Sequence, residues 1–431
     1  MKHYGIASLK YSVDGCRPLI QHIGRLDHQL VLQAYQSNKQ LFERACYLID
    51  AAAESRCLEL VEYFHIESFA TSLPFATTAA LHIAAMNGDL EIVTFLHLNR
   101  SEGITLMTFD AVCKRGHLDV VAYLHEHGMD GGATPMAFIG AASNGHLDVI
   151  KYLMEHCQHV KPTSYAMEQA VRGGHYDTMR YLFETAGFKD SKLPKNIMDV
   201  AAANGHLDIV SFLDLNHKSI GATPAAVDNA ASNGHLVVVK YLTQNRTEGW
   251  TAKAVENACA EGYLDIVHHL VRLRPDLGGP LCMVRAVENG HLEVVKLLMA
   301  NGYLTKCKYQ YYLVDLAVKH GRFELTKFLF ENTTGEISQS CINWAVQFNH
   351  ADILDYLIIN YKTTDTVWRS ALEAGCMAGY LDIVRCIKKH RPALELSALS
   401  TNIALLESRG RFSILHFLYP DNERWAPPPR D

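Results

Sequence analysis

The sequence predicts an all-α solenoid of about thirteen helix-turn-helix repeats joined by short connections. Three observations support this: a unit that is clearest in Ala141–Leu153, near-copies of it at 201–208 and 230–236, and a nearly constant spacing. When the glycine of each copy is taken as its marker, successive markers lie 28 to 32 residues apart. Self-similarity at such a period indicates stacked supersecondary units. The marker positions are Arg56, Gly88, Gly116, Gly145, Gly174, Gly205, Gly234, Gly262, Gly290, Gly321, Asn349, Gly379 and Gly410.

Composition limits the possible partners and compartments. A net charge of −6 over 431 residues disfavours nucleic acid and anionic membranes, because both favour a strongly basic face. No apolar run approaches the roughly 20 residues of a membrane span. The eleven cysteines have no paired spacing, and Cys113, Cys259 and Cys376 occupy small core positions three residues before a marker. We therefore expect a monomeric cytoplasmic protein, with a nuclear location as an open alternative.

The two ends of the chain depart from the repeat. Residues 1–44 should form an irregular helical cap, with a helix over Leu30–Leu48 that covers the exposed end of the first repeat. The repeat array spans residues 45–418. Residues 419–431 contain a run of three prolines near their end and are expected to form an extended, disordered tail. Docking of this tail to a proline-reading domain is an alternative.

Within each repeat the first helix has defined start and stop signals. A threonine eleven residues before the marker can accept a hydrogen bond from a free N–H of the first turn. Pro135, Pro224 and Pro280 occupy the first helical position, where no N–H is needed. The marker should end the helix in the left-handed conformation, which suits glycine and asparagine. The threonines are Thr77, Thr105, Thr134, Thr163, Thr223 and Thr251.

The second helix should begin directly after the marker. Apolar residues two, four, five and eight positions after it form one stripe of an amphipathic helix, as in Leu118, Val120 and Val121. A carboxylate at the third position, such as Asp119, faces the positive end of the helix dipole. An aromatic residue at the seventh, such as Tyr123, is expected to pack between neighbouring second helices.

This pattern resembles the ankyrin repeat, and most fully so in Leu81–Val93. The resemblance covers roughly residues 45–418 and implies a curved array whose first helices line a concave, protein-binding face. Two features depart from the family pattern: the threonine lies eleven rather than nine residues before the glycine, and the period is shorter than the family's 33 residues. The β-hairpins that connect ordinary ankyrin repeats should therefore be reduced or missing.

The histidines do not indicate a metal centre or a catalytic site. A residue that recurs in register along a solenoid is an architectural feature, and seven histidines directly follow a marker. His156, Cys157 and His159 lie close in sequence but lack a second ligand pair at zinc spacing. We also find no nucleophile elbow or phosphate-binding loop. The prediction is a non-catalytic protein without cofactor or metal. The seven histidines are His117, His146, His175, His206, His235, His291 and His350.

A row of carboxylates lies six residues before the marker, where ankyrin repeats have a histidine, here His82. The carboxylates could accept N–H bonds from the adjacent connection. Alternatively, they could form an acidic ladder that attracts a basic segment of a partner. The row comprises Asp50, Asp110, Glu168, Asp199, Asp228, Glu256, Asp315 and Glu373.

Residues two positions before the marker vary while their surroundings stay constant. Ankyrin repeats present contact side chains there, so we expect a scaffold or adaptor that holds a protein or peptide on its concave face. Two alternatives remain: a substrate-recruiting subunit of a ubiquitin-ligase or kinase complex, and a metal-dependent enzyme. The candidate partner-binding residues from the variable positions and the acidic row are Met86, Lys114, Ser143, Arg172, Asp199, Asp228, Ser232, Glu256, Glu288 and Lys319.

Overall fold

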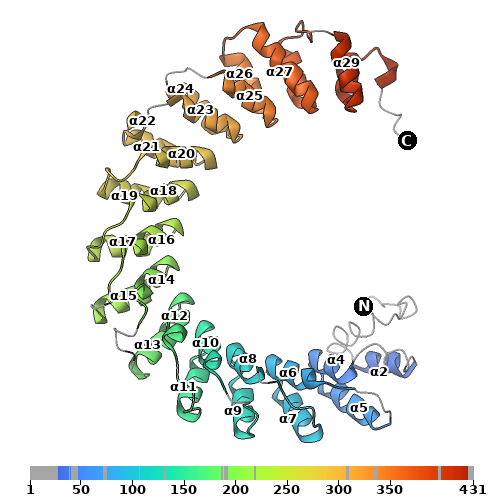
Figure 1. Ribbon diagram of the computed structural model, residues 1–431, viewed down its shortest axis with the longest axis vertical. Coiled ribbons are helices and arrows are strands. Elements are labelled where there is room, and N and C mark those ends of the chain that lie inside the picture. The colour runs from blue at the N-terminus through green and yellow to red at the C-terminus, as the bar shows by residue number, and fades with distance from the viewer. Residues whose placement is uncertain are drawn as a thin grey trace. The chain divides into compact units, whose positions relative to one another are not determined.

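A computed structural model gives the arrangement of the chain (Figure 1). It describes residues 28–37, 39, 47–70, 75–105, 107–130, 133–185, 188, 193–217, 220–306, 310–333, 338–396 and 399–425. Within these ranges the regular structure is helical and no strand is present. The expected helical-repeat fold is therefore confirmed. The chain divides into two compact units, residues 1–222 and 223–431.

In the first unit, helix α2 (His28–Ser37) precedes six helix pairs. The first helices of the pairs are α4 (Leu48–Glu54), α6 (Thr78–Asn87), α8 (Thr108–Arg115), α10 (Pro135–Ser143), α12 (Ser164–Arg172) and α14 (Ile197–Ala203). The second helices are α5 (Leu58–Ser68), α7 (Leu90–Asn99), α9 (Leu118–Glu126), α11 (Leu147–His156), α13 (Tyr176–Thr185) and α15 (Leu207–Asn216). First helices contact the first helices of adjacent repeats, so they form one layer of the unit (Figure 1).

The second unit continues the same pairing. Its first helices are α16 (Pro224–Ser232), α18 (Ala252–Glu261), α20 (Pro280–Asn289), α23 (Gln310–Lys319), α25 (Gln339–Gln347), α27 (Asp365–Ala378) and α29 (Leu399–Ser408). Its second helices are α17 (Leu236–Asn245), α19 (Leu264–Leu273), α21 (Leu292–Ala300), α24 (Phe323–Asn332), α26 (Ala351–Asn360), α28 (Leu381–His390) and α30 (Phe412–Leu418). The short α22 (Tyr303–Lys306) and a 3-10 turn, η3 (Glu423–Trp425), complete the described elements.

The marker residues end the first helices as predicted. All thirteen have a positive φ, from 58° at Asn349 to 90° at Gly379, and Arg56 adopts 61°. This left-handed conformation lets the chain reverse within one residue and begin the second helix at once. A residue other than glycine is disfavoured there by contact between its Cβ and the backbone.

Threonine caps start most of the first helices that were expected to have them. The side chains of Thr77, Thr134, Thr163, Thr223 and Thr251 each accept a backbone N–H from the first turn. Thr105 does not cap a helix, because α8 begins three residues later, at Thr108. Its hydroxyl instead lies 2.9 Å from that of Thr108.

The core lies between the two helix layers of each unit. In α9, Val120, Val121 and Leu124 are fully buried, as the amphipathic stripe predicted. The hydroxyl of Tyr123 lies 2.9 Å from Nδ1 of His97 on α7, which places this ring between successive second helices as expected. Cys113, Cys259 and Cys376 are buried among apolar side chains. Burial also raises the pKa of Cys376 to about 12.

The two ends of the chain are described only in part. Of the helix predicted over Leu30–Leu48, α2 covers the beginning, residues 38 and 40–46 lie outside the described ranges, and Leu48 belongs to α4. Residues 419–425 are not extended as expected, because the buried Trp425 donates its indole N–H to Glu407 at 2.8 Å and packs against Tyr419. Residues 426–431, with the prolines, lie outside the described ranges. No described helix is long and apolar enough to cross a membrane.

Candidate partner-binding surface

Adjacent repeats are tied together by the aspartates of the acidic row. Asp50 accepts the backbone N–H of Thr77 at 2.9 Å and its hydroxyl at 2.7 Å. Asp228 binds Thr251 in the same way, at 2.8 Å and 2.6 Å. Each threonine also caps its own helix, so one carboxylate fixes where the next repeat begins. The same hydroxyl contact joins Asp110 to Thr134 and Asp315 to Ser338.

These contacts limit what the acidic row can offer to a partner. Asp199 is 6% exposed and Asp228 is 8% exposed, whereas Glu256 is half-buried. A carboxylate that is buried, with both oxygens already bonded to the next repeat, is poorly accessible to a ligand. The hydrogen bonds therefore favour the tying role over the acidic ladder at Asp228.

His82 makes the corresponding contact in its repeat. Its Nδ1 lies 2.9 Å from the hydroxyl of Thr108, the first residue of α8. Burial lowers the pKa of His82, because the charged imidazolium is poorly solvated at this site. This position therefore links successive first helices through either a carboxylate or a neutral ring.

The histidines after the markers form a second link, which we call the marker junction. It joins a marker to the residue that follows the next marker. Nε2 of His291 donates to the carbonyl of Ala260 at 2.9 Å, and the ring lies against Gly262. A Cβ at Gly262 would be 2.4 Å from Nδ1 of His291, so only glycine leaves room for the ring. Equivalent ring contacts join Gly88 to His117, Gly116 to His146, Gly145 to His175, Gly174 to His206 and Gly321 to His350.

The variable residues lie on a surface that we call the first-helix face. It comprises the positions nine, five and two before each marker, which share one side of a helix because they are spaced i, i+4 and i+7. Lys114, Arg172 and Lys319 are exposed there. Met86, Ser143, Ser232 and Glu288 are half-buried. Of the ten candidate residues, Asp199, Asp228 and Glu256 belong to the acidic row rather than to this face.

Contacts across the first-helix face connect neighbouring repeats. Asn257 donates to the hydroxyl of Ser232 at 2.8 Å. The ammonium group of Lys319 lies 5.2 Å from the ring centre of Trp344. Each contact joins the position two before one marker to the position five before the next. The face within a unit is therefore a continuous surface rather than a set of isolated side chains.

Sequence reasoning missed one part of this face. Met107, Met136 and Tyr165 lie nine residues before their markers and are 77%, 56% and 53% exposed. Met107 directly precedes α8, and Met136 and Tyr165 are the second residues of α10 and α12; these three first helices pack together. The signal was available, because these positions lie seven residues before the variable residues Lys114, Ser143 and Arg172 on the same helix face.

The soft ligands near the end of α11 do not gather around a common point in the described part of the chain. Cys157 is buried, and burial raises the pKa of its thiol. His156 is engaged within its own helix, where Nδ1 donates to the carbonyl of Tyr152 at 3.0 Å. In the described ranges, three potential metal-binding side chains come together only at His28, Cys57 and Glu59.

Comparison with known protein families agrees with this geometry. The family model for ankyrin repeats, in three copies, matches residues 48–135, 81–164, 111–193 and 255–341. No curated protein gives a match to the chain. The matched ranges together cover more than half of the sequence and coincide with the helix pairs described above. The chain therefore belongs to the ankyrin-repeat family.

Proposed function

We propose that the protein is a binding scaffold that holds a segment of a partner protein on the first-helix face of its first unit. Ankyrin repeats are typically protein-binding modules. The observation that carries the proposal is the exposure of Met107, Met136 and Tyr165 at the starts of three successive first helices. Large apolar side chains gathered on one surface of a soluble protein are typical of interaction sites.

The charges on this face indicate the chemistry of the partner. Lys114 and Arg172 lie seven residues after Met107 and Tyr165, and both are exposed. Arg172 is partly neutralised by Glu168, which accepts a hydrogen bond from it at 2.9 Å. A partner segment with apolar side chains and at least one carboxylate would match this arrangement, because opposite charges favour encounter and register.

The test is a selection of binding peptides from a random library. We expect the full-length protein to enrich peptides that combine apolar and acidic residues. The double variant Lys114→Glu/Arg172→Glu should bind these peptides about tenfold more weakly, since two attractive contacts become repulsive. The melting temperature should be unchanged, because both side chains are exposed.

A matched control is available on the second helices. Lys151→Glu/Arg180→Glu makes the same charge change on α11 and α13, and Arg180 is paired with Glu184 four residues away, as Arg172 is with Glu168. This control should bind the selected peptides like the wild type. Equal binding by all three proteins would contradict the assignment of the first-helix face.

A further inference from the structure

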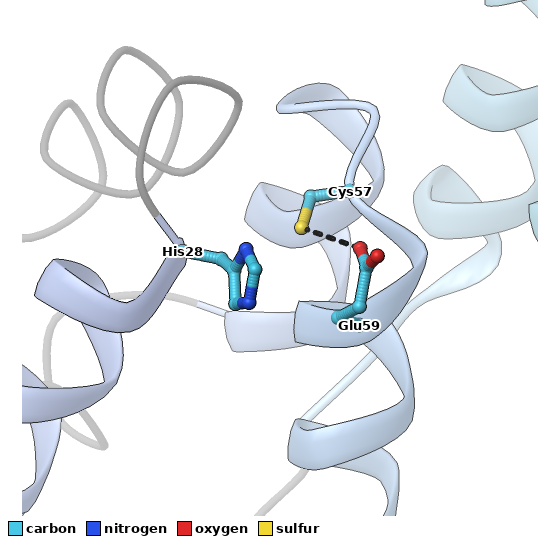
Figure 2. Close-up of side chains that lie close together, drawn as sticks. All are labelled: His28, Cys57 and Glu59. Carbon is cyan, nitrogen blue, oxygen red and sulfur yellow. Dashed lines mark hydrogen bonds between the residues drawn. The ribbon is translucent and has the colours of Figure 1, made fainter.

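Three side chains of different chemistry meet where α2 packs against the first repeat (Figure 2). They are His28, the first residue of α2, with Cys57 and Glu59 at the start of α5. One ligand atom from each lies within 4.8 Å of the other two. The Cys57 thiol donates to Oε2 of Glu59 at 3.2 Å, and Figure 2 shows the His28 ring facing both groups.

The position of Cys57 departs from the repeat pattern. Cys57 directly follows the marker Arg56, at the position where seven of the other repeats have a histidine. Here the imidazole comes instead from the adjacent helix α2. Helix α2 thus supplies an imidazole and the start of the first repeat supplies a thiol, so the pair forms only where the two pack together.

Glu59 also differs from the equivalent carboxylates. In α9, α11 and α15 the carboxylate at this place accepts the backbone N–H of the residue after it, as Asp119 does from Val120 at 2.8 Å. The carboxylate of Glu59 faces the Cys57 thiol, and its side chain is exposed to solvent. An ion could therefore reach the cluster from solution.

We propose that His28, Cys57 and Glu59 bind a zinc ion. Zinc accepts thiolate sulfur, imidazole nitrogen and carboxylate oxygen in tetrahedral geometry. At bond lengths of about 2.0–2.3 Å, the ligand atoms of such a site lie about 3.3–3.6 Å apart, so their observed separation needs only small rotations of the side chains. Three protein ligands leave one coordination position for water. On binding, the Cys57 thiol releases its proton to solvent and the sulfur–zinc bond forms without any redox change.

The bound ion would fasten α2 to the first repeat. Because α2 covers the end of the repeat stack, zinc should protect this helix from local opening. The effect is confined to the N-terminal edge of the first unit and is independent of partner binding on the first-helix face.

Metal content and cobalt spectroscopy of the full-length protein test this proposal. We expect one equivalent of Zn²⁺ after equilibration and, with Co²⁺ in its place, a thiolate-to-metal charge-transfer band. Cys57→Ser and His28→Gln should each lower the Zn²⁺ affinity by about a hundredfold or more, because each removes a ligand. Addition of Zn²⁺ should also slow hydrogen exchange in α2 of the wild type and not of the variants.

Cys341→Ser is the matched control. Cys341 donates to a carboxylate oxygen of Asp315 at 2.8 Å, so it has the same thiol–carboxylate contact. Asp315 also accepts the hydroxyl of Ser338 in the next repeat, and no histidine of the described residues joins the pair. This variant should bind zinc like the wild type. The proposal is overturned if the wild type binds no stoichiometric Zn²⁺, or if Cys57→Ser and His28→Gln bind it with unchanged affinity.

Discussion

The first marker junction and the later ones solve the same packing problem differently. At Gly116 the marker has no side chain, and the ring of His146 fills the space above it. At the first junction the marker is Arg56, and the residue that would carry the ring is Asp89. Nε of Arg56 donates to both carboxylate oxygens of Asp89, at 2.8 and 2.9 Å.

The difference shows which part of the junction is required. Both versions keep a left-handed marker, with φ 61° at Arg56 and 81° at Gly116. Both also place a side chain of the next repeat against that marker. The chemistry of the contact can therefore change from ring packing to an ion pair, and glycine markers also accept Tyr263 or Arg322 in place of the histidine. The backbone reversal cannot change.

The largest effect is expected from Gly116→Ala. The new Cβ would lie 2.3 Å from Nδ1 of His146, in addition to the cost of a left-handed alanine. We expect a loss of about 3 kcal/mol in unfolding free energy, from roughly 1–2 kcal/mol of backbone strain plus overpacking. Gly128→Ala is the control, since it has φ 67° with no atom within 4 Å of its Cβ. It should cost about 1 kcal/mol by chemical denaturation.

The next effect concerns the buried tie between repeats. Asp228→Ala removes the acceptor for both the N–H and the hydroxyl of Thr251, and should cost about 2 kcal/mol. Asp265→Ala, at an exposed carboxylate of α19, should change stability by less than about 0.5 kcal/mol. If the two variants lose the same unfolding free energy, the hydrogen bonds of Asp228 do not stabilise the contact between repeats, and the acidic-ladder hypothesis regains support.

A smaller effect should follow from Asp89→Ala at the first junction. The ion pair is partly exposed, so its loss should cost about 0.5–1 kcal/mol, and the cost should shrink at high salt. The double variant Arg56→Gly/Asp89→His converts this junction to the common form and should regain at least wild-type stability in denaturation curves. A double variant less stable than Asp89→Ala would show that the two versions are not equivalent.

The smallest effect is a pH dependence of stability at His82. This histidine occupies the position that has a carboxylate in eight other repeats, and its ring contacts Thr108 of the next repeat. Burial lowers the folded-state pKa of His82 below its ordinary value of 6.5. The folded state therefore binds this proton less readily than the unfolded state, so stability is full above about pH 6.5 and falls as the pH drops toward the folded pKa. His82→Gln should reduce the loss of melting temperature between pH 7.5 and 5.5. An identical loss in both proteins would contradict this assignment.

The sequence predicted those features that depend on local chemistry repeated in register. Marker conformation, threonine caps and the buried stripe each follow from one residue type at one position. The helix cap predicted at Thr105 is absent, because α8 starts three residues later, at Thr108. Nothing in the sequence of this segment indicates the later start. The contact of Trp425 with Glu407 was not predicted, because it joins residues 18 apart in sequence and no repeat spacing relates them.

The candidate surface was predictable only in part. The variable residues Lys114 and Arg172 were found, but the aspartates of the acidic row could not be separated from ligand-binding groups without their hydrogen bonds. Met107 and Tyr165 share the helix face of these variable residues, but their exposure depends on packing between repeats. The meeting of His28 with Cys57 crosses the irregular N-terminal segment, where no repeat spacing relates the two residues.

The account depends on an energetic coupling between each marker and the side chain of the next repeat that packs against it. A double-mutant cycle with Gly116→Ala and His146→Ala tests this most directly by chemical denaturation. If the ring causes the clash, Gly116→Ala should cost about 3 kcal/mol in the wild type but only about 1 kcal/mol in His146→Ala, where backbone strain alone remains. Equal costs in both backgrounds would contradict the claim.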